Sequence, residues 1–184
     1  LTLAAAILLG SVLPAGRARA QDPGKPSEYE VKAAYLLNFT RYVEWPAGTF
    51  EHPDDPINIC VLGRNPFGTA LERILEGQTS QGHPLRVRYP DGPADARGCQ
   101  LTYVSAQERR LRPDVALALD HPGVLTVGDG EEFARRGGII AFTLVDQTVR
   151  FVVNLGARDR GGLRISSRML ALANAVVDTA PRRR

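Results

Sequence analysis

Residues 57–77, INICVLGRNPFGTALERILEG, place a strand pattern directly before a helix pattern. The almost continuous apolar run over 57–62 predicts a buried strand that ends at Gly63. Asn65 is positioned to cap the following helix, with Pro66 at its first position and Gly77 at its end. A strand followed so closely by a helix is typical of an α/β fold.

The same alternation continues on both sides of this stretch. Ser27 and Glu30 form a capping box that opens a largely apolar helix, and Pro46 is expected to end that helix near residues 44–45. Asp129 is predicted to cap a later helix, with Glu132 in the capping-box position. Further strands are predicted over 85–89, 101–105, 124–127, 139–144 and 148–155. Further helices are predicted over 109–119, with an interruption at Pro113, from Asp129 to Gly137, and from Ser166 or Ser167 through Val177.

The strands over 139–144 and 148–155 are close enough to form a hairpin, whereas most of the earlier strands are separated by predicted helices. Helical connections favour parallel pairing, with the helices packed on the sheet. The sequence therefore predicts an α/β three-layer sandwich with a mostly parallel central sheet, a late antiparallel hairpin and helices on both faces.

The N-terminal residues predict export. Residues 1–13 are nearly all apolar, which suits a signal peptide, and the run is shorter than the roughly 20 residues that a membrane-spanning helix needs. Ala18-Arg19-Ala20 then provides a cleavage site before Gln21. A buried N-terminal helix is the alternative. We expect a signal peptide over 1–20, a linker over 21–26, one domain over 27–178 and a basic tail over 179–184.

The charge pattern argues against a nucleic-acid-binding protein. The chain has a net charge of +3, which falls to +1 without Arg17 and Arg19, and the remaining charges are spread along the sequence. The arginines over 182–184 are interpreted as a solvated tail. The composition is that of an ordinary globular domain, with 43% hydrophobic and 23% charged residues.

The chain contains two cysteines, Cys60 and Cys99. An even number of cysteines in an exported protein favours a disulfide, and two buried free thiols are the alternative. The two residues form neither a Cys-x-x-Cys motif nor a recognisable zinc site.

The motifs that usually mark an enzyme are missing. The turn over 63–68 is bounded by glycines but lacks the lysine of a phosphate-binding loop, so we interpret it as a tight turn, with weak anion binding as the alternative. His52, His83 and His121 each precede a proline in a predicted loop and have no evident nucleophile beside them. We therefore expect a binding protein rather than an enzyme, without a metal or cofactor.

The candidate binding residues are Trp45 and a group of arginines. Trp45 is either part of the core or an exposed aromatic anchor for a partner. Arginines around the last predicted strand and a predicted loop over 156–162 are suited to a carboxylate or phosphate. They are Arg150, Arg158, Arg160 and Arg164, and Arg164, just before the helix start at Ser166, is the strongest candidate.

Several segments, taken in order, resemble the YfiR-like family of periplasmic proteins. The resemblance covers about residues 28–177. It rests on EVKAAYLLNF (30–39), YVEWP (42–46), ICVLG (59–63), PFG (66–68), LTV (125–127), GGII (137–140), RFVVNL (150–155) and LRISSRMLALA (163–173).

This resemblance implies a periplasmic repressor of a membrane-bound diguanylate cyclase, which lowers cyclic di-GMP and biofilm formation. The implied partner is the periplasmic part of an inner-membrane diguanylate cyclase or sensor kinase. A small metabolite at Arg164 and the neighbouring Ser166, and a homodimer, are also implied. The alternative is a small-ligand-binding protein that serves a sensor kinase or transporter. A periplasmic hydrolase is a third hypothesis, from a different class.

The resemblance also bears on the cysteines. Cys60 and Cys99 fall where the family has a structural disulfide. Some members have a second cysteine pair, whose positions near Gly137 and Gly138 hold other residues here. The resemblance therefore implies a structural disulfide rather than a redox switch.

Overall fold

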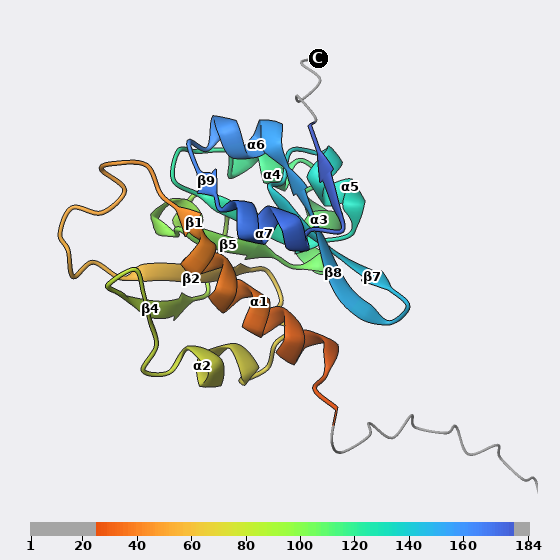
Figure 1. Cartoon of the computed structure of the whole chain (residues 1–184), viewed down its shortest axis with the longest axis horizontal. Coiled ribbons are helices and arrows are strands. Elements are labelled where there is room, and N and C mark those ends of the chain that lie inside the picture. Colours follow the sequence, from red (N-terminus) through yellow and green to blue (C-terminus); the bar gives the residue numbers. More distant parts are fainter. Residues whose placement is uncertain (1–24, 179–184) are drawn as a thin grey trace, which may run out of the picture.

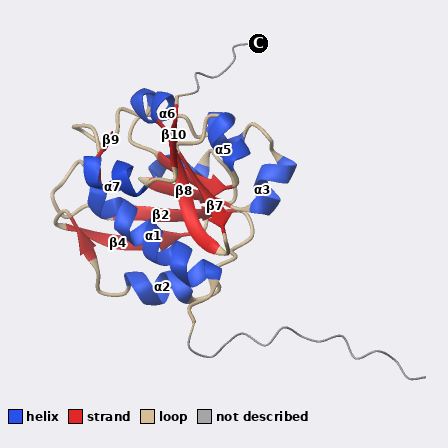
Figure 2. Ribbon diagram, turned by 45° about the vertical axis from the view of Figure 1, so that its right-hand side comes forward, coloured by secondary structure: helices blue, strands red, loops and turns tan. Residues whose placement is uncertain are grey.

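A central sheet with helices on both faces is the architecture of residues 25–178, the part of the chain that the computed structural model describes (Figures 1 and 2). The sheet has eight strands in the order β10-β8-β7-β6-β5-β2-β4-β3, and β1 and β9 form a separate ribbon. The predicted α/β architecture is thus confirmed. The predicted signal peptide, the first four linker residues and the basic tail lie outside the described residues.

Short helices and strands alternate along the chain after one long helix. The elements are α1 (Glu28–Tyr42), β1 (Val43–Glu44), β2 (Ile57–Leu62), α2 (Ala70–Leu75), β3 (Thr79–Ser80), β4 (His83–Arg88), the 3₁₀ helix η1 (Asp95–Gly98), β5 (Leu101–Val104), α3 (Ala106–Leu111), α4 (Val115–Ala118), β6 (Leu125–Asp129), α5 (Glu131–Arg135), β7 (Ile140–Val145), β8 (Thr148–Asn154), α6 (Leu155–Arg160), β9 (Arg164–Ile165), α7 (Ser167–Leu172) and β10 (Ala175–Val177).

The order of the strands contains one reversal. Strands β4, β2, β5, β6 and β7 are parallel to one another, and β8 turns back as the antiparallel partner of β7. From β2 the chain passes through α2 to β4 on one side, and it then returns to form β5 on the other side of β2. The carboxyl ends of β2 and β5 therefore lie next to each other at the point where the strand order changes direction.

Strand β2 shows how the sequence builds two hydrophobic cores. Alternate residues of a strand point to opposite faces. Ile59 and Val61 accordingly belong to the first core, which lies under α1, α2 and α7. Cys60 and Leu62 belong to the second core, which lies under η1, α4 and α5. The continuous apolar run is explained by this burial on both sides.

The first helix begins as predicted but ends earlier. The Ser27 hydroxyl accepts the N–H of Glu30, and the Glu30 carboxylate accepts the N–H of Ser27 at 2.8 Å. The helix ends at Tyr42 instead of near residues 44–45, because Val43 is extended and pairs with Ile165 in the β1–β9 ribbon. A pairing partner so far along the chain overrides the local helical pattern.

Two other helix starts differ from the prediction. Asn65 does not cap α2, because its side-chain oxygen accepts the N–H of Phe67 at 2.8 Å and closes a local turn. The helix begins after Thr69 instead. Asp129 does not cap α5 either: it is the last residue of β6, and its carboxylate faces Lys32 and Tyr103.

Three segments near the C-terminal half were predicted with the wrong extent. The helix over 109–119 is divided around Pro113, as predicted, into α3 and α4, but α3 already begins at Ala106. The loop over 156–162 is largely the helix α6. The last helix, α7, stops at Leu172, and Val176 and Val177 instead form β10 beside β8. Pairing with the edge of the sheet explains this last difference.

Gly138 is required by the packing of Phe133. A Cβ atom at residue 138 would lie 2.3 Å from the Phe133 ring. We expect Gly138→Ala to lower the free energy of unfolding by about 2 kcal/mol, because overpacking a core displaces rigid neighbours. Urea unfolding measures this, and Gly92→Ala is the control, since a Cβ atom at residue 92 would enter open space. Equal losses in the two variants would contradict this account.

Candidate functional site

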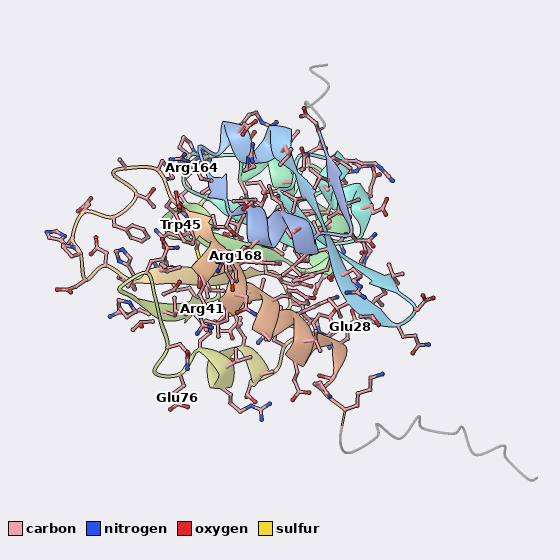
Figure 3. All side chains as sticks on the ribbon, viewed as in Figure 1. Glu28, Arg41, Trp45, Glu76, Arg164 and Arg168 are labelled. Atoms are coloured by element: carbon pink, nitrogen blue, oxygen red, sulfur yellow. A yellow bond between two sulfur atoms is a disulfide. The ribbon has the colours of Figure 1, made fainter. Side chains whose placement is uncertain are left out.

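The β1–β9 ribbon brings three of the predicted site residues to one surface. Glu44 lies opposite Arg164 in the register of the two strands, and the backbone N–H of Ser166 donates to the carbonyl of Tyr42 at 2.9 Å. Trp45 follows β1 directly, so it lies beside the same ribbon, as Figure 3 shows. Residues from opposite ends of the domain sequence are thereby joined. We call the surface of Arg41, Trp45, Arg164, Ser166 and Arg168 the ribbon surface.

The ribbon surface carries exposed positive charge. Arg41, Arg164 and Arg168 are exposed on the same side of the molecule (Figure 3). Arg164 and Arg168 form no ion pair with any residue between 25 and 178, and Arg41 donates to the Gln78 side chain at 3.0 Å. Guanidinium groups that are free to form bidentate bonds can hold a carboxylate or phosphate.

Trp45 is half-buried, so its position is intermediate between the two predicted roles, a core residue and an exposed anchor. Its ring packs against the core and lies edge-on to Phe50, with 6.2 Å between ring centroids. Its indole N–H donates to the carbonyl of Gln100 at 3.3 Å. The ring is therefore held in place by the domain while part of it remains accessible to a partner.

Ser166 has a structural role as the N-cap of α7. Its hydroxyl accepts the N–H of Met169 and caps α7. Replacing the cap would weaken the first turn of α7 and with it the position of Arg168. A direct contact between Ser166 and a ligand stays a prediction.

The structure does not bring the four predicted arginines together. Arg150 is exposed in the β7–β8 hairpin, across from Thr143, and this hairpin lies far from β9 in both ribbon views (Figures 1 and 2). Arg158 and Arg160 belong to α6, where they pair with Asp159 and Asp120 respectively. Only Arg164 of the four lies on the ribbon surface.

Sequence reasoning missed a buried charged cluster beneath α1. The Lys32 side chain is only 4% exposed, and its Nζ lies 2.7 Å from Asp129 Oδ1. It also pairs with Glu28, one turn earlier in the helix. The second oxygen of Asp129 accepts the hydroxyl of Tyr103 at 2.6 Å. These bonds tie the N-terminal half of α1 to the carboxyl ends of β5 and β6.

Lys32 keeps its positive charge at neutral pH although it is buried. Burial alone would lower the pKa of Lys32, but its hydrogen bonds to Asp129 and Glu28 outweigh burial and raise the pKa. Burial, reinforced by the charge of Asp129, raises the pKa of Tyr103. A lysine on an apolar helix face was the available sequence signal, but only the fold shows its partner.

Two of the three histidines, His52 and His83, contact the same residue, Asp55. His83 is the first residue of β4 rather than a loop residue, and its ring stacks on Phe50 with 4.0 Å between centroids. His52 is an exposed neighbour of Asp55. Between residues 25 and 178, no group of three or more His, Cys, Asp or Glu side chains is arranged to hold a metal ion. In the same part of the chain, none of the helices has the length and apolar character needed to cross a membrane.

Comparison with known proteins identifies a family and, among the solved structures, a distant relative. The sequence model of a family described as YfiR/HmsC-like matches residues 29–174. A conserved domain protein from Vibrio cholerae O1 biovar El Tor aligns over 82% of this chain, with 14% sequence identity and a TM-score of 0.48. The chain covers 60% of that protein.

Proposed function

Because the chain belongs to the YfiR/HmsC-like family, we propose that it represses a membrane-bound diguanylate cyclase from the periplasm and thereby lowers cyclic di-GMP and biofilm formation. The family match supports in general a periplasmic regulator of diguanylate cyclase, with a regulatory rather than a catalytic role. The match spans almost every described residue, and this observation carries the proposal. The disulfide between Cys60 and Cys99 suits an oxidising compartment.

In this proposal residues 1–20 direct export and are removed, and the domain over 27–178 acts in the periplasm, alone or as a homodimer. The ribbon surface contacts the periplasmic part of the cyclase, or of a sensor kinase. Its exposed arginines suit an acidic partner segment, and the anchored ring of Trp45 suits the centre of such a contact. A small metabolite held by Arg164 would compete for the same arginines and so relieve repression.

Deleting the gene is expected to raise cellular cyclic di-GMP and surface attachment. Reintroducing the wild-type chain should restore both, whereas Arg164→Ala combined with Arg168→Ala should leave cyclic di-GMP near the level of the deletion strain. Arg86→Ala is the control, since Arg86 is an exposed arginine of β4. Periplasmic amounts of each variant are compared by immunoblot.

Two results would contradict the proposal. Unchanged cyclic di-GMP after deletion would exclude repression of a cyclase. Full repression by the double arginine variant would exclude the ribbon surface as the contact.

The exposed arginines beside a half-buried tryptophan also favour the alternative function, a small-ligand-binding protein that serves a sensor kinase or transporter. Thermal unfolding with aromatic carboxylates tests it. A midpoint shift that disappears in Arg164→Ala, without any change of cyclic di-GMP in the deletion strain, would favour this function over repression.

A further inference from the structure

The reversal in strand order creates a second place where a ligand can bind. The connection from β2 contains α2, which contributes Leu71 and Leu75 to the first core. The connection from β5 contains α3 and α4, and Val115 and Ala116 of α4 belong to the core on the opposite face. The two connections therefore leave neighbouring strand ends in opposite directions. In open α/β sheets, this arrangement leaves a crevice in which ligands bind.

A cavity of about 620 Å³ occupies this position. One wall is the turn after β2, and the other is the segment after β5 with the first turns of α3. Tyr29, near the start of α1, lines one side of the crevice. We call this cavity the switch crevice; its walls include Tyr29, Arg64, Asn65, Ser105, Gln107 and Arg110.

The two walls approach each other closely at Gly63. Gly63 has a φ of +86°, and a Cβ atom there would lie 2.5 Å from the Ser105 hydroxyl oxygen. A side chain at residue 63 is thus disfavoured both by the backbone conformation and by the contact. The absence of that side chain allows Arg64 and Ser105 to line a common cavity.

The switch crevice carries positive charge that the domain does not neutralise. Arg64 and Arg110 are exposed on its two walls, and neither pairs with a carboxylate among residues 25–178. Two carboxylates on the adjacent elements already have partners, since Glu108 of α3 pairs with Arg112 and Asp129 of β6 pairs with Lys32. An anion between the two walls would therefore meet arginine side chains without displacing an existing ion pair.

The remaining walls select for size and shape. Tyr29 lies edge-on to Phe67, with 5.5 Å between ring centroids, which holds an aromatic ring at the side of the crevice. Pro66 adds an apolar surface on the wall that carries Arg64. A planar or apolar group attached to the anion would pack there, while bulk phosphate would gain only the charged contacts.

We propose that the switch crevice binds a small organic anion, whose phosphate or carboxylate group is held by Arg64 and Arg110 and whose apolar part packs against Tyr29 and Pro66. This site is separate from the ribbon surface. It includes part of the turn over 63–68, for which weak anion binding was the alternative interpretation. It does not depend on the proposed repression of a cyclase.

Two-dimensional ¹H–¹⁵N NMR titration of the protein tests this site, with phenyl phosphate, benzoate and inorganic phosphate as probes at physiological ionic strength. We expect saturable shifts of the Gly63, Arg64 and Ser105 amides with phenyl phosphate or benzoate, and weaker binding of inorganic phosphate. Arg64→Gln and Arg110→Gln should each raise Kd by about tenfold, since each removes a charge-assisted contact. Arg164→Gln and Arg86→Gln are the controls and should leave Kd unchanged.

The preferred probe identifies the chemistry: tighter binding of phenyl phosphate indicates a phosphate ester, and tighter binding of benzoate indicates a carboxylate. The proposal is overturned if no saturable shift occurs at millimolar concentration, or if the shifts centre on the ribbon surface. It is also overturned if the double variant Arg64→Gln/Arg110→Gln binds as well as the wild type. Because the assay contains no cyclase, each of these results leaves the proposed repression to be judged separately.

Discussion

Replacing Cys60 and Cys99 together by alanine is expected to lower the free energy of unfolding by about 4 kcal/mol, from the entropy of closing a loop of this length in the unfolded chain. The disulfide joins two residues that are 39 positions apart. It connects β2 to the residue two places before β5, and both cysteines are buried in the second core. Urea unfolding followed by circular dichroism measures the loss.

Unfolding the wild-type chain with and without a reductant provides the matched control. The two cysteines supply the only thiols of the chain, so a reductant changes one bond. The double variant and the reduced wild type should then unfold at similar urea concentrations. A loss below about 1 kcal/mol in both would contradict the assignment of a stabilising disulfide. Under the proposed function, a folded double variant that restores low cyclic di-GMP in the deletion strain would support a structural role of the disulfide over a redox role.

The second large effect is expected at Asp129. Asp129→Asn keeps the shape of the side chain but removes the negative charge that faces the buried Nζ of Lys32 at 2.7 Å. We expect the free energy of unfolding at pH 7 to fall by about 3 kcal/mol, because breaking a buried pair leaves a charge without full compensation. Glu28, which is more exposed, retains part of the interaction. Urea unfolding at pH 7 measures the change.

The double variant Lys32→Met/Asp129→Leu is the control. It removes both charges, so it should be more stable than Asp129→Asn alone, since apolar replacement of a whole buried pair is often nearly neutral. Asp129→Asn with wild-type stability at pH 7 would contradict an energetic role for the pair.

The pH dependence gives an independent check. The pKa of Lys32 is raised in the folded state, so its contribution is complete below the unfolded value of about 10.4 and is lost as pH rises through the folded value. The stability difference between wild type and Asp129→Asn should therefore be constant at neutral pH and shrink above about pH 10.

The sequence alone was sufficient for the architecture and for several of its details. The buried run over 57–62, the capping box of Ser27 and Glu30, and the hairpin of β7 and β8 are all present in the structure. Each of these depends on neighbours within a few residues, through alternation, capping or turn formation. The pairing of Cys60 with Cys99 was also predictable, because the chain offers those two cysteines and no others.

Only the tertiary structure decided how the candidate sites are assembled. The β1–β9 ribbon ends α1 early and places Arg164 beside Trp45, and the sheet order sets Lys32 against Asp129 and Arg64 near Arg110. Local patterns instead suggested that Asp129 caps a helix and that Arg150 and Arg164 belong to one cluster. Helix caps and strand alternation are written in adjacent residues, whereas these contacts depend on which strands pair across the whole domain. That is why the sequence determined the layers of this protein and its disulfide, while the arrangement of its charged surfaces followed only from the fold.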